Sequence, residues 1–326
     1  MMKLPRRQFL RLAAGAAALP AISRGTRAQT YPTRPVRIFV GFPPGGGTDA
    51  LARFIGQWLS ERLGQEFFIE NRVGGGGNIA TEAAARSSAD GYTLLLVTPT
   101  NAINATLYDK LNFDFIRDIA PIVGIARVPN VMLVNPSFPP KTIPEFIAYA
   151  KANPGKINMA SAGNGTPAHM TVELFKIMAG VNVVHVPYRG GAPAMTDLLG
   201  GQVQVYFGAT TGSIEYIRAG KLRALGVTGA TRSAVPPEIP SVADFLPGFE
   251  SSQWYGVGAA KNTPVEIVAK LNKEINASLS DPKIQAHLAD LGGTLLAGSP
   301  ADFGKLIEEE TVRWGKIIRA ANIRPR

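Results

Sequence analysis

Short apolar runs alternate with segments of helical periodicity along most of this chain, and this alternation constrains the fold more than any other sequence feature. The runs at 36–42, 66–72 and 92–100 have the length and composition of buried strands. Between them lie a helical apolar pattern over 51–63 and a glycine-rich turn with an alanine-rich helix over 74–88. This β-α-β-α-β order predicts a parallel sheet with helices on its faces.

A second set of alternating elements follows a long apolar run at 119–134. That run contains Gly124 and Pro129, so we expect a bent or interrupted strand. Four helix and strand pairs are expected between 142 and 229, then a proline-rich surface connection (233–252), a strand (253–264) and two helices (264–279 and 300–322). The last two helices have no strands of their own, so we expect them to pack against the sheet of the first set, which has only three clear strands. We therefore predict lobe 1 at 29–130 with 251–326, lobe 2 at 131–250, and two hinge crossovers.

The N-terminus has the features of an export signal. Arg6 and Arg7 precede a short apolar run, and small residues lie before a possible cut after Ala28. The run is too short to span a bilayer. Residues 1–28 are therefore expected to be a twin-arginine signal peptide that sends the protein, already folded, to the periplasm. An amphipathic basic helix is the alternative.

Charge and motif content exclude several functional classes. The net charge is +10, but residues 1–28 hold six Lys or Arg and no acid, which leaves +4 for the rest. No basic run with interleaved aromatics remains, so we expect no nucleic-acid partner. The chain has no cysteine, and it lacks GxGxxG, GxxxxGK[ST], HExxH and GxSxG motifs. Pro282 interrupts an S-x-x-K spacing at 280–283. We therefore expect no enzyme activity, no cofactor and no metal.

Five predicted helices begin in loops rich in glycine, proline and hydroxyl residues. The free N–H groups and the dipole of a helix start attract anions, and helix starts in parallel α/β sheets lie at the edge where ligands bind. Any one loop is explained equally well as a tight turn with a helix cap. Three belong to lobe 1 and two to lobe 2, which favours a small ligand with two anionic ends, held by both lobes. The loops lie at 43–49, 74–78, 98–101, 161–167 and 188–193.

Individual side chains near these loops leave alternatives open. Asp49 either caps its helix or organises water that bridges to a ligand, and the two roles can coexist. Phe42 is either a wall of the ligand site or a core residue. His169, at a helix start, either hydrogen-bonds a ligand or caps the helix, and His185 is expected to be a plain strand residue. Arg53, like other loop arginines, ranks below the glycine amides as a ligand contact.

Several segments resemble the Bug receptors, the periplasmic solute-binding proteins of tripartite tricarboxylate transporters. The resemblance is carried by "GFPPGGGTDALARFIGQWL", "INMASAGNGTPAHMTVELF", "VPYRGGAPAMTDLLGGQV" and "WYGVGAAKNTPVEIVAKLN", and it extends over nearly all of the chain after residue 28. It implies a two-lobed α/β type II periplasmic-binding fold, each lobe a parallel or mixed sheet flanked by helices, that closes on its ligand about a hinge. A monomer that binds a small carboxylate and serves membrane permease subunits is therefore expected.

The resemblance also implies a set of binding residues. The family's aspartate after the strand "VQVYFG" is replaced here by Gly208, which favours a plain carboxylate over an amino acid. A receptor that presents its ligand to a membrane sensor, or a periplasmic enzyme with Asp49 or His169 as base, are the alternatives. The expected ligand contacts are Phe42, Gly45, Gly46, Asp49, Thr98, Thr100, Ser161, Asn164, Gly165, Thr166, His169, Gly190 and Gly191.

Overall fold

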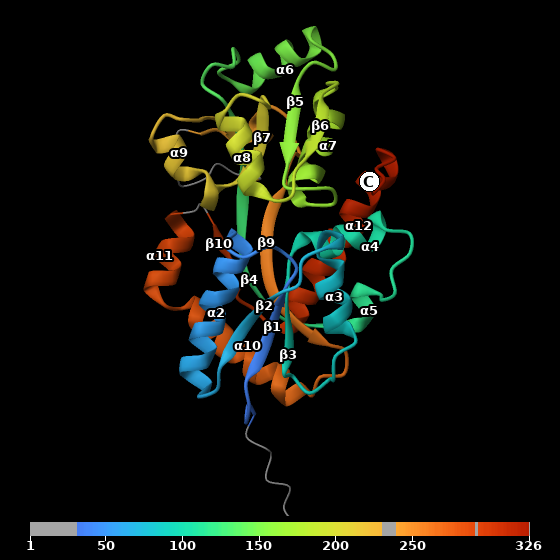
Figure 1. Cartoon of the computed structure of the whole chain (residues 1–326), viewed down its shortest axis with the longest axis vertical. Coiled ribbons are helices and arrows are strands. Elements are labelled where there is room, and N and C mark those ends of the chain that lie inside the picture. The colour runs from blue at the N-terminus through green and yellow to red at the C-terminus, as the bar shows by residue number, and fades with distance from the viewer. Residues whose placement is uncertain (1–30, 230–238, 291–292, 326) are drawn as a thin grey trace, which may run out of the picture. The chain divides into compact units, whose positions relative to one another are not determined.

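The computed structural model describes residues 31–229, 239–290 and 293–325 (Figure 1). Arg34–Arg326 forms one unit, to which all the elements below belong. The predicted signal peptide lies outside the described residues. In the part of the chain that is described, no helix combines the length and the apolar character needed to cross a membrane.

The first three strands are parallel, as predicted, in the order β2-β1-β3. They are β1 (Val36–Val40), β2 (Phe67–Asn71) and β3 (Thr93–Val97), with α2 (Gly47–Leu63), the turn η1 (Gly75–Gly77) and α3 (Asn78–Ala85) between them. A helix start was expected at 98–101, and α4 (Pro99–Leu107) begins there, but α5 (Phe115–Asp118) was not predicted as an element. Thr98 caps α4 in a capping box, and Pro99 occupies the first helical position, which needs no N–H donor.

The second β/α set follows the predicted order of helices and strands. Strand β5 lies between β6 and β7 and is parallel to both. The elements are α6 (Ile143–Ala152), β5 (Asn158–Ser161), α7 (Pro167–Ala179), β6 (Val184–Pro187), α8 (Gly191–Leu199), β7 (Val205–Ala209), η2 (Thr210–Gly212), α9 (Ile214–Arg218) and β8 (Arg223–Val227).

Two strands connect these sets. Strand β4 (Ile119–Val134) pairs antiparallel with β9 (Ser252–Ala260) up to Pro129, and from Asn130 onward with β7 and β8. Its register shifts within the β9 pairing and again in the β8 pairing, so the expectation of a bent strand is confirmed. Because β9 also pairs with β3, the strands form one continuous hydrogen-bonded path in which β4 is the link.

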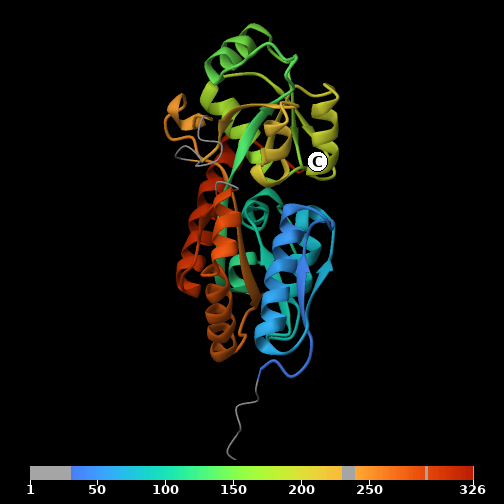
Figure 2. The same cartoon turned by 90° about the vertical axis from the view of Figure 1, so that its left-hand side faces the viewer.

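The C-terminal region contains three helices rather than the two predicted. They are α10 (Val265–Leu279), α11 (Pro282–Asp290) and α12 (Pro300–Ala320), and the short strand β10 (Thr294–Leu295) pairs with β4. Figure 2 shows the C-terminal helices, coloured orange to red, running beside the strands, and both α10 and α12 contact β4. The helices therefore cover the sheet, as the sequence argument required.

Apolar side chains form separate clusters in the two sequence regions. One cluster includes Phe39, Leu95, Trp254 and Phe303, whereas another is built around Phe146, Phe175, Phe207 and Phe249. A smaller cluster joins α4, α7 and α12. In the chain, the short turn η3 (Val242–Asp244) lies between β8 and β9. Separate cores are what two lobes would need, because each lobe must bury its own apolar side chains.

Candidate functional site

The loop between β1 and α2 is organised by Asp49, whose side chain is almost fully buried. The carboxylate accepts hydrogen bonds from the Gly45 amide (3.0 Å), from Asn71 Nδ2 (2.9 Å) and from Arg53 Nε (2.9 Å). Asn71 Nδ2 also donates to the carbonyl of Phe42 (2.9 Å). Asp49 therefore holds the glycine loop in its folded shape from the first turn of α2, whose N-cap, Gly46, receives no side-chain hydrogen bond.

The ionisation of Asp49 follows from these contacts. Burial raises its pKa, but the hydrogen bonds from Arg53, Gly45 and Asn71 and the charge of Arg53 outweigh burial and lower the pKa below its ordinary value. Thr48, beside Asp49, is hydrogen-bonded to the buried Tyr255 of β9, whose pKa burial raises to about 12. The carboxylate is thus charged, and the tyrosine neutral, throughout the physiological range.

The glycine loop before α3 is fastened to α4. Residues Gly74–Gly77 all have positive φ (56° to 134°), a backbone that side-chain-bearing residues rarely adopt. Asn104 Nδ2 donates to the Gly76 carbonyl (2.9 Å) and to Asn78 Oδ1 (3.0 Å). Because a carbonyl can only accept, the Asn104 amide orientation is set, and Oδ1 must point away from this loop.

The first turns of α4 carry two buried polar atoms without a hydrogen-bond partner among the described residues: Thr100 Oγ1 and Asn104 Oδ1. These residues lie four positions apart in α4, so they share one face of the helix. Buried polar groups are normally paired, and an unpaired one calls for an explanation. The neighbouring Thr98 and Asn101 are hydrogen-bonded. The Thr98 amide donates to Asn101 Oδ1 at the helix start, and Asn101 Nδ2 donates to Thr81 Oγ1.

The loop between β5 and α7 brings the second group of predicted residues together. Thr166 is the N-cap of α7, as predicted, and its Oγ1 donates to the Gly163 carbonyl (2.7 Å). Ser161 is fully buried, and the Gly163 amide donates to its Oγ (3.2 Å). The Gly165 amide donates to Nδ1 of the buried His169 (3.2 Å). Asn164, at the tip, is half-buried.

His185 lies in β6, as expected, but it is more than a plain strand residue. Its Nε2 is 2.6 Å from Ser161 Oγ, and its ring stacks on that of His169, with centroids 3.9 Å apart and planes at 10°. With Glu173 these rings place three potential metal-ligand atoms within 4.8 Å of one another. The lone pairs of an imidazole lie in the ring plane, so two nearly parallel stacked rings do not direct them at a common ion. The arrangement therefore does not fit a metal.

The loop between β6 and α8 lies against the β5–α7 loop. The amides of Tyr188 and Gly190 donate to the carbonyls of Ser161 and Ala162 (both 3.0 Å). Tyr188 Oη donates to Asp197 (2.6 Å), which fixes the start of the loop to α8. Gly191 lies next to the hydroxyl of Tyr206, which a Cβ at this position would approach to 3.0 Å. The two loops therefore act as one rigid edge.

The two groups of loops meet where α4 approaches the residue before α7. A Cβ placed on Gly165 would lie 2.8 Å from Asn104 Oδ1 and 2.8 Å from Leu107 Cδ2, so only glycine fits. The apolar cluster that joins α4, α7 and α12 lies beside this contact. It consists of Ile103, Leu107, Met170, Trp314 and Ile318. Thr100 and Asn104 thus share a helix face that reaches the loop carrying Ser161 to Thr166.

The structure changes which groups are available to donate hydrogen bonds to a ligand. The amides of Gly45, Gly165 and Gly190 were expected to bind a ligand, but each already donates a hydrogen bond within the protein. Thr100 Oγ1 has no hydrogen-bond partner among the described residues, whereas Ser161 Oγ already contacts the Gly163 carbonyl (3.2 Å) and His185 Nε2 (2.6 Å). Gly46 and Phe42 lie on the β1–α2 loop, where Gly46 is exposed and Phe42 half-buried.

Three residues in or near the site were not predicted from the sequence. Asn104 could have been found by extending the helix that was expected to start at 98–101, because it follows Thr100 by about one helical turn. The contact of His185 with Ser161 joins residues of different strands and has no local signal. Asn130, where β4 changes partners, has a buried Nδ2 without a partner among the described residues.

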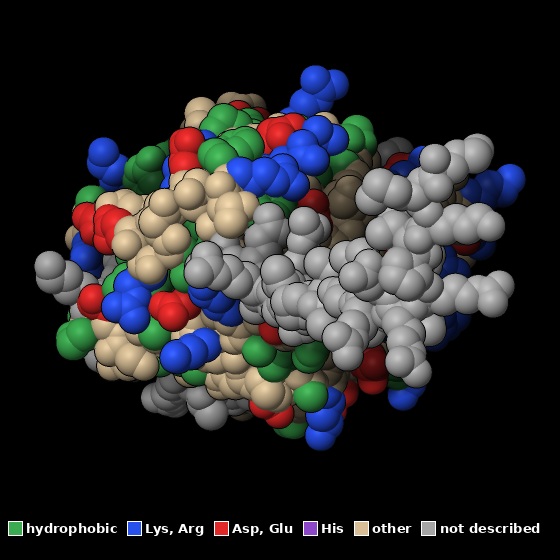
Figure 3. Space-filling model, turned by 90° about the horizontal axis from the view of Figure 1, so that it is seen from below, with side chains coloured by type: hydrophobic (Ala, Val, Ile, Leu, Met, Phe, Trp, Pro, Cys, Tyr) green, Lys and Arg blue, Asp and Glu red, His purple; other side chains and the backbone are tan. Residues whose placement is uncertain are grey.

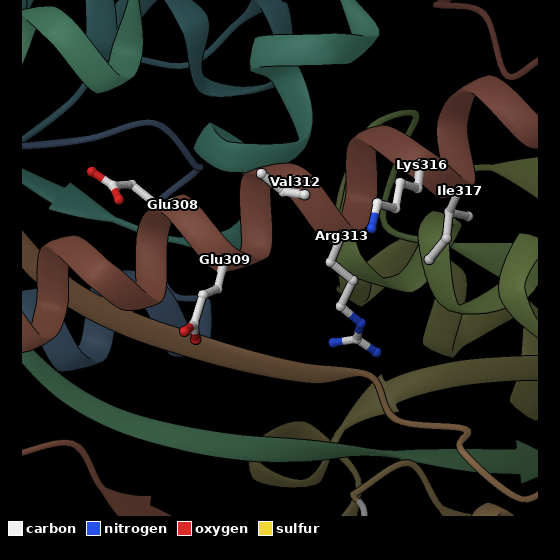
Figure 4. A pocket seen from close by; sticks show the side chains of 6 residues that line it. All are labelled: Glu308, Glu309, Val312, Arg313, Lys316 and Ile317. Atoms are coloured by element: carbon white, nitrogen blue, oxygen red, sulfur yellow. The ribbon is translucent and has the colours of Figure 1, made fainter.

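A shallow hollow along α12 is separate from these loops. It is lined by Glu308, Glu309, Val312, Arg313, Lys316 and Ile317, all from one helix (Figure 4). Arg313 is already engaged there, with ion pairs to Glu250 and Glu310. On the face seen in Figure 3, Lys and Arg side chains are interspersed with Asp and Glu rather than gathered in one patch.

Comparison with known proteins gives a consistent result. Residues 51–323 match the model of a family described as tripartite tricarboxylate transporter family receptor. Protein BugT of Bordetella pertussis is 36% identical over 305 residues, covering 93% of this chain and 94% of BugT. A solved R. palustris protein with adipate has a TM-score of 0.86 at 38% identity and covers 91% of this chain and 100% of its own. The periplasmic binding protein BugD has a TM-score of 0.84 at 34% identity, with coverage of 91% and 100%.

Proposed function

Because the chain belongs to the tripartite tricarboxylate transporter family of receptors, we propose that it is an extracytoplasmic receptor that captures a small carboxylate for such a transporter. The family and the structural relatives are solute-binding receptors rather than enzymes. One observation carries the site: within the part of the chain that the structure describes, the buried Thr100 hydroxyl has no hydrogen-bond partner, and it lies on the helix face that meets the Ser161–Thr166 loop. A carboxylate only accepts hydrogen bonds, so it could accept the hydrogen bond that the Thr100 hydroxyl has to donate.

We place the ligand between the loops of α2, α3 and α4 and the loops of α7 and α8. The proposed contacts are the thirteen residues expected from the sequence, with Thr100 and Ser161 as the principal donors. Asn104 is not among them, because its unpaired atom among the described residues is the acceptor Oδ1, which a carboxylate would repel. Asp49 contributes by holding the Gly45 loop. The close approach of Gly165 to Asn104 supports this placement, because it joins the two loop groups.

The lobe boundaries proposed are 29–130 with 251–326 for one lobe and 131–250 for the other. Strand β4 exchanges partner β9 for β7 and β8 between Pro129 and Asn130, and Ser251 lies just before β9. These two crossovers would be the hinge. A ligand can drive closure only if it binds the closed form more tightly than the open one. The permease subunits would then recognise the closed, loaded monomer.

A plain carboxylate is the proposed ligand class. A Cβ at Gly208, where the family pattern has an aspartate, would lie 2.9 Å from Ser213 Oγ and 3.1 Å from Leu133 Cδ1, so an acid has little room there. Without it, the ammonium group of an amino acid would lack a charged partner. The relative of known structure with adipate supports a dicarboxylate as the first compound to test.

Replacing Thr100 by valine tests the site. We expect about tenfold to hundredfold weaker binding of the best carboxylate in a thermal-shift screen, because a hydrogen bond to a charged group is worth about 1.5–3 kcal/mol. Stability without ligand should be unchanged or higher, since this hydroxyl has no internal partner to lose.

Thr263→Val is the matched control. Thr263 is also buried, but its hydroxyl donates to the Ala260 carbonyl (2.7 Å), so this variant should lose about 1 kcal/mol of stability and keep its affinity. Calorimetric titration and thermal melting measure both quantities. Equal affinity of Thr100→Val and the unmodified protein would remove Thr100 from the site.

The proposed location is the periplasm, supported by the periplasmic receptors among the relatives, and the proposed route is twin-arginine export. The signal residues are Arg6 and Arg7. Replacing both by lysine should leave the protein in the cytoplasmic fraction with an uncut N-terminus, as measured by fractionation and mass spectrometry. Normal export of that variant would argue for another route.

A further inference from the structure

Two of the three histidines in the chain lie face to face beside the proposed carboxylate site. His185 contacts Ser161 Oγ through Nε2 at 2.6 Å, and His169 accepts the Gly165 amide at Nδ1. Each ring is thus attached to a different residue of the same loop. The third histidine, His287, belongs to α11.

The Ser161 hydroxyl can donate one hydrogen bond, and the protonation state of His185 Nε2 determines which acceptor receives it. At 2.6 Å, one of the two facing atoms must supply a proton to the other. If Nε2 of His185 is bare, the Ser161 proton goes to the ring, and the hydroxyl offers only lone pairs to a ligand. If Nε2 carries a proton, the ring donates to Oγ, and the Ser161 proton is left for the Gly163 carbonyl, 3.2 Å away, or for a bound carboxylate, whose charge makes it the stronger acceptor.

Charge placement around the stack favours protonation of His185 over His169. The lone pair at His169 Nδ1 is used by the Gly165 amide, and two charged rings 3.9 Å apart would repel each other. From α7, the groups facing His185 are His169 and Glu173, and Lys176 pairs with Glu173 at 2.9 Å. Neither the β5 residues paired with β6 nor the rest of β6 carry a charged side chain.

We propose that His185 is a positioning residue of the carboxylate site and that it takes up a proton as the carboxylate binds. The inference rests on the proposed function, because it needs an anion at Ser161. Proton uptake aims the Ser161 hydroxyl at the ligand and adds a positive charge next to it. An ordinary imidazole is mostly neutral above about pH 6.5, so a bound anion shifts this equilibrium toward the protonated ring. Binding therefore tightens as the pH falls from 8 to 6.

The test is calorimetric titration with adipate, or with the acid that gives the largest shift in the screen above. Titrations at pH 7 in two buffers of different ionisation enthalpy count the protons taken up. The unmodified protein should take up a measurable fraction of one proton and bind on the order of tenfold more tightly at pH 6 than at pH 8. His185→Gln keeps a hydrogen-bonding group for Ser161 but cannot titrate, so its uptake should fall to the value given by the ligand's own ionisation.

The outcomes separate the two proposals. If no carboxylate binds at any pH, the proposed function itself fails. If carboxylates bind but the unmodified protein takes up no proton, or His185→Gln takes up as much as it does, the role of His185 is overturned. Thermal melting reports whether His185→Gln folds. If it does not, Ser161→Ala is the second variant. It retains both rings and the charge of a protonated His185 but removes the hydroxyl, so it should bind more weakly than the unmodified protein at pH 6 and show a smaller gain in affinity between pH 8 and pH 6. A gain as large as that of the unmodified protein would also overturn the proposal.

Discussion

Gly165→Ala is expected to weaken carboxylate binding by roughly tenfold to hundredfold, or about 1.4–2.8 kcal/mol. The added Cβ would lie 2.8 Å from both Asn104 Oδ1 and Leu107 Cδ2. Neither neighbour can move away easily, because two hydrogen bonds hold the Asn104 amide and Leu107 is packed in a cluster. The methyl group would hold the α4 and α7 loops apart, and a ligand bound between them would lose contacts on one side.

The matched control for this variant is Gly180→Ala. Gly165 and Gly180 both have positive φ (73° and 61°), so an alanine at either position incurs about 1–2 kcal/mol of backbone strain. A Cβ at Gly180 meets no atom within 4 Å. Both variants should lose similar stability through strain, but only Gly165→Ala should lose affinity beyond it. Equal affinities in calorimetric titration would mean that the two loops do not approach each other in the ligand-bound protein.

Asp49→Ala is expected to lower the free energy of unfolding by about 2–4 kcal/mol and to weaken ligand binding as well. In the structure the carboxylate is buried and accepts from Gly45, Asn71 and Arg53, so alanine leaves buried donors unpaired. Denaturant unfolding measures the loss.

Asp49→Asn is the informative comparison. Its amide oxygen can still accept from Gly45 or Asn71, and the ion pair that it loses involves Arg53, whose side chain is half exposed and contributes little. We expect a smaller loss, about 1 kcal/mol at neutral pH. A loss as large as that of Asp49→Ala would show that the charge, and not the acceptor oxygen, holds the loop.

The stability contributed by Asp49 also depends on pH. Its folded-state pKa is below the ordinary value, so the unfolded chain binds the proton more readily. The contribution is therefore complete above the unfolded pKa of about 3.9 and is lost as the pH falls through the folded pKa. The stability difference between the unmodified protein and Asp49→Asn should be constant at neutral pH and shrink in acid. A difference that grows in acid would contradict the ion-pair geometry.

Local patterns predicted most elements but missed the helices α5 and α11, and they predicted only the start of α4. In α4, seven of nine residues are buried, so the helix lacks the polar face that gives a helical period. Helix α11 is only nine residues long and directly follows α10, so the sequence pattern did not separate it. By contrast, α7 has a Thr166 cap and Pro167 at its first position, both local signals, and its start was predicted correctly.

The sequence by itself determined the alternation of strands and helices, the loops where anions could bind, and the family resemblance, because periodicity, caps and ordered motifs are local properties of the chain. Only the tertiary structure decided how those loops are used. The burial of Asp49, the unpartnered hydroxyl of Thr100 and the contact between Ser161 and His185 depend on which strands and helices become neighbours. Such contacts join residues far apart in the chain, and no local pattern encodes which donor is left free for a ligand.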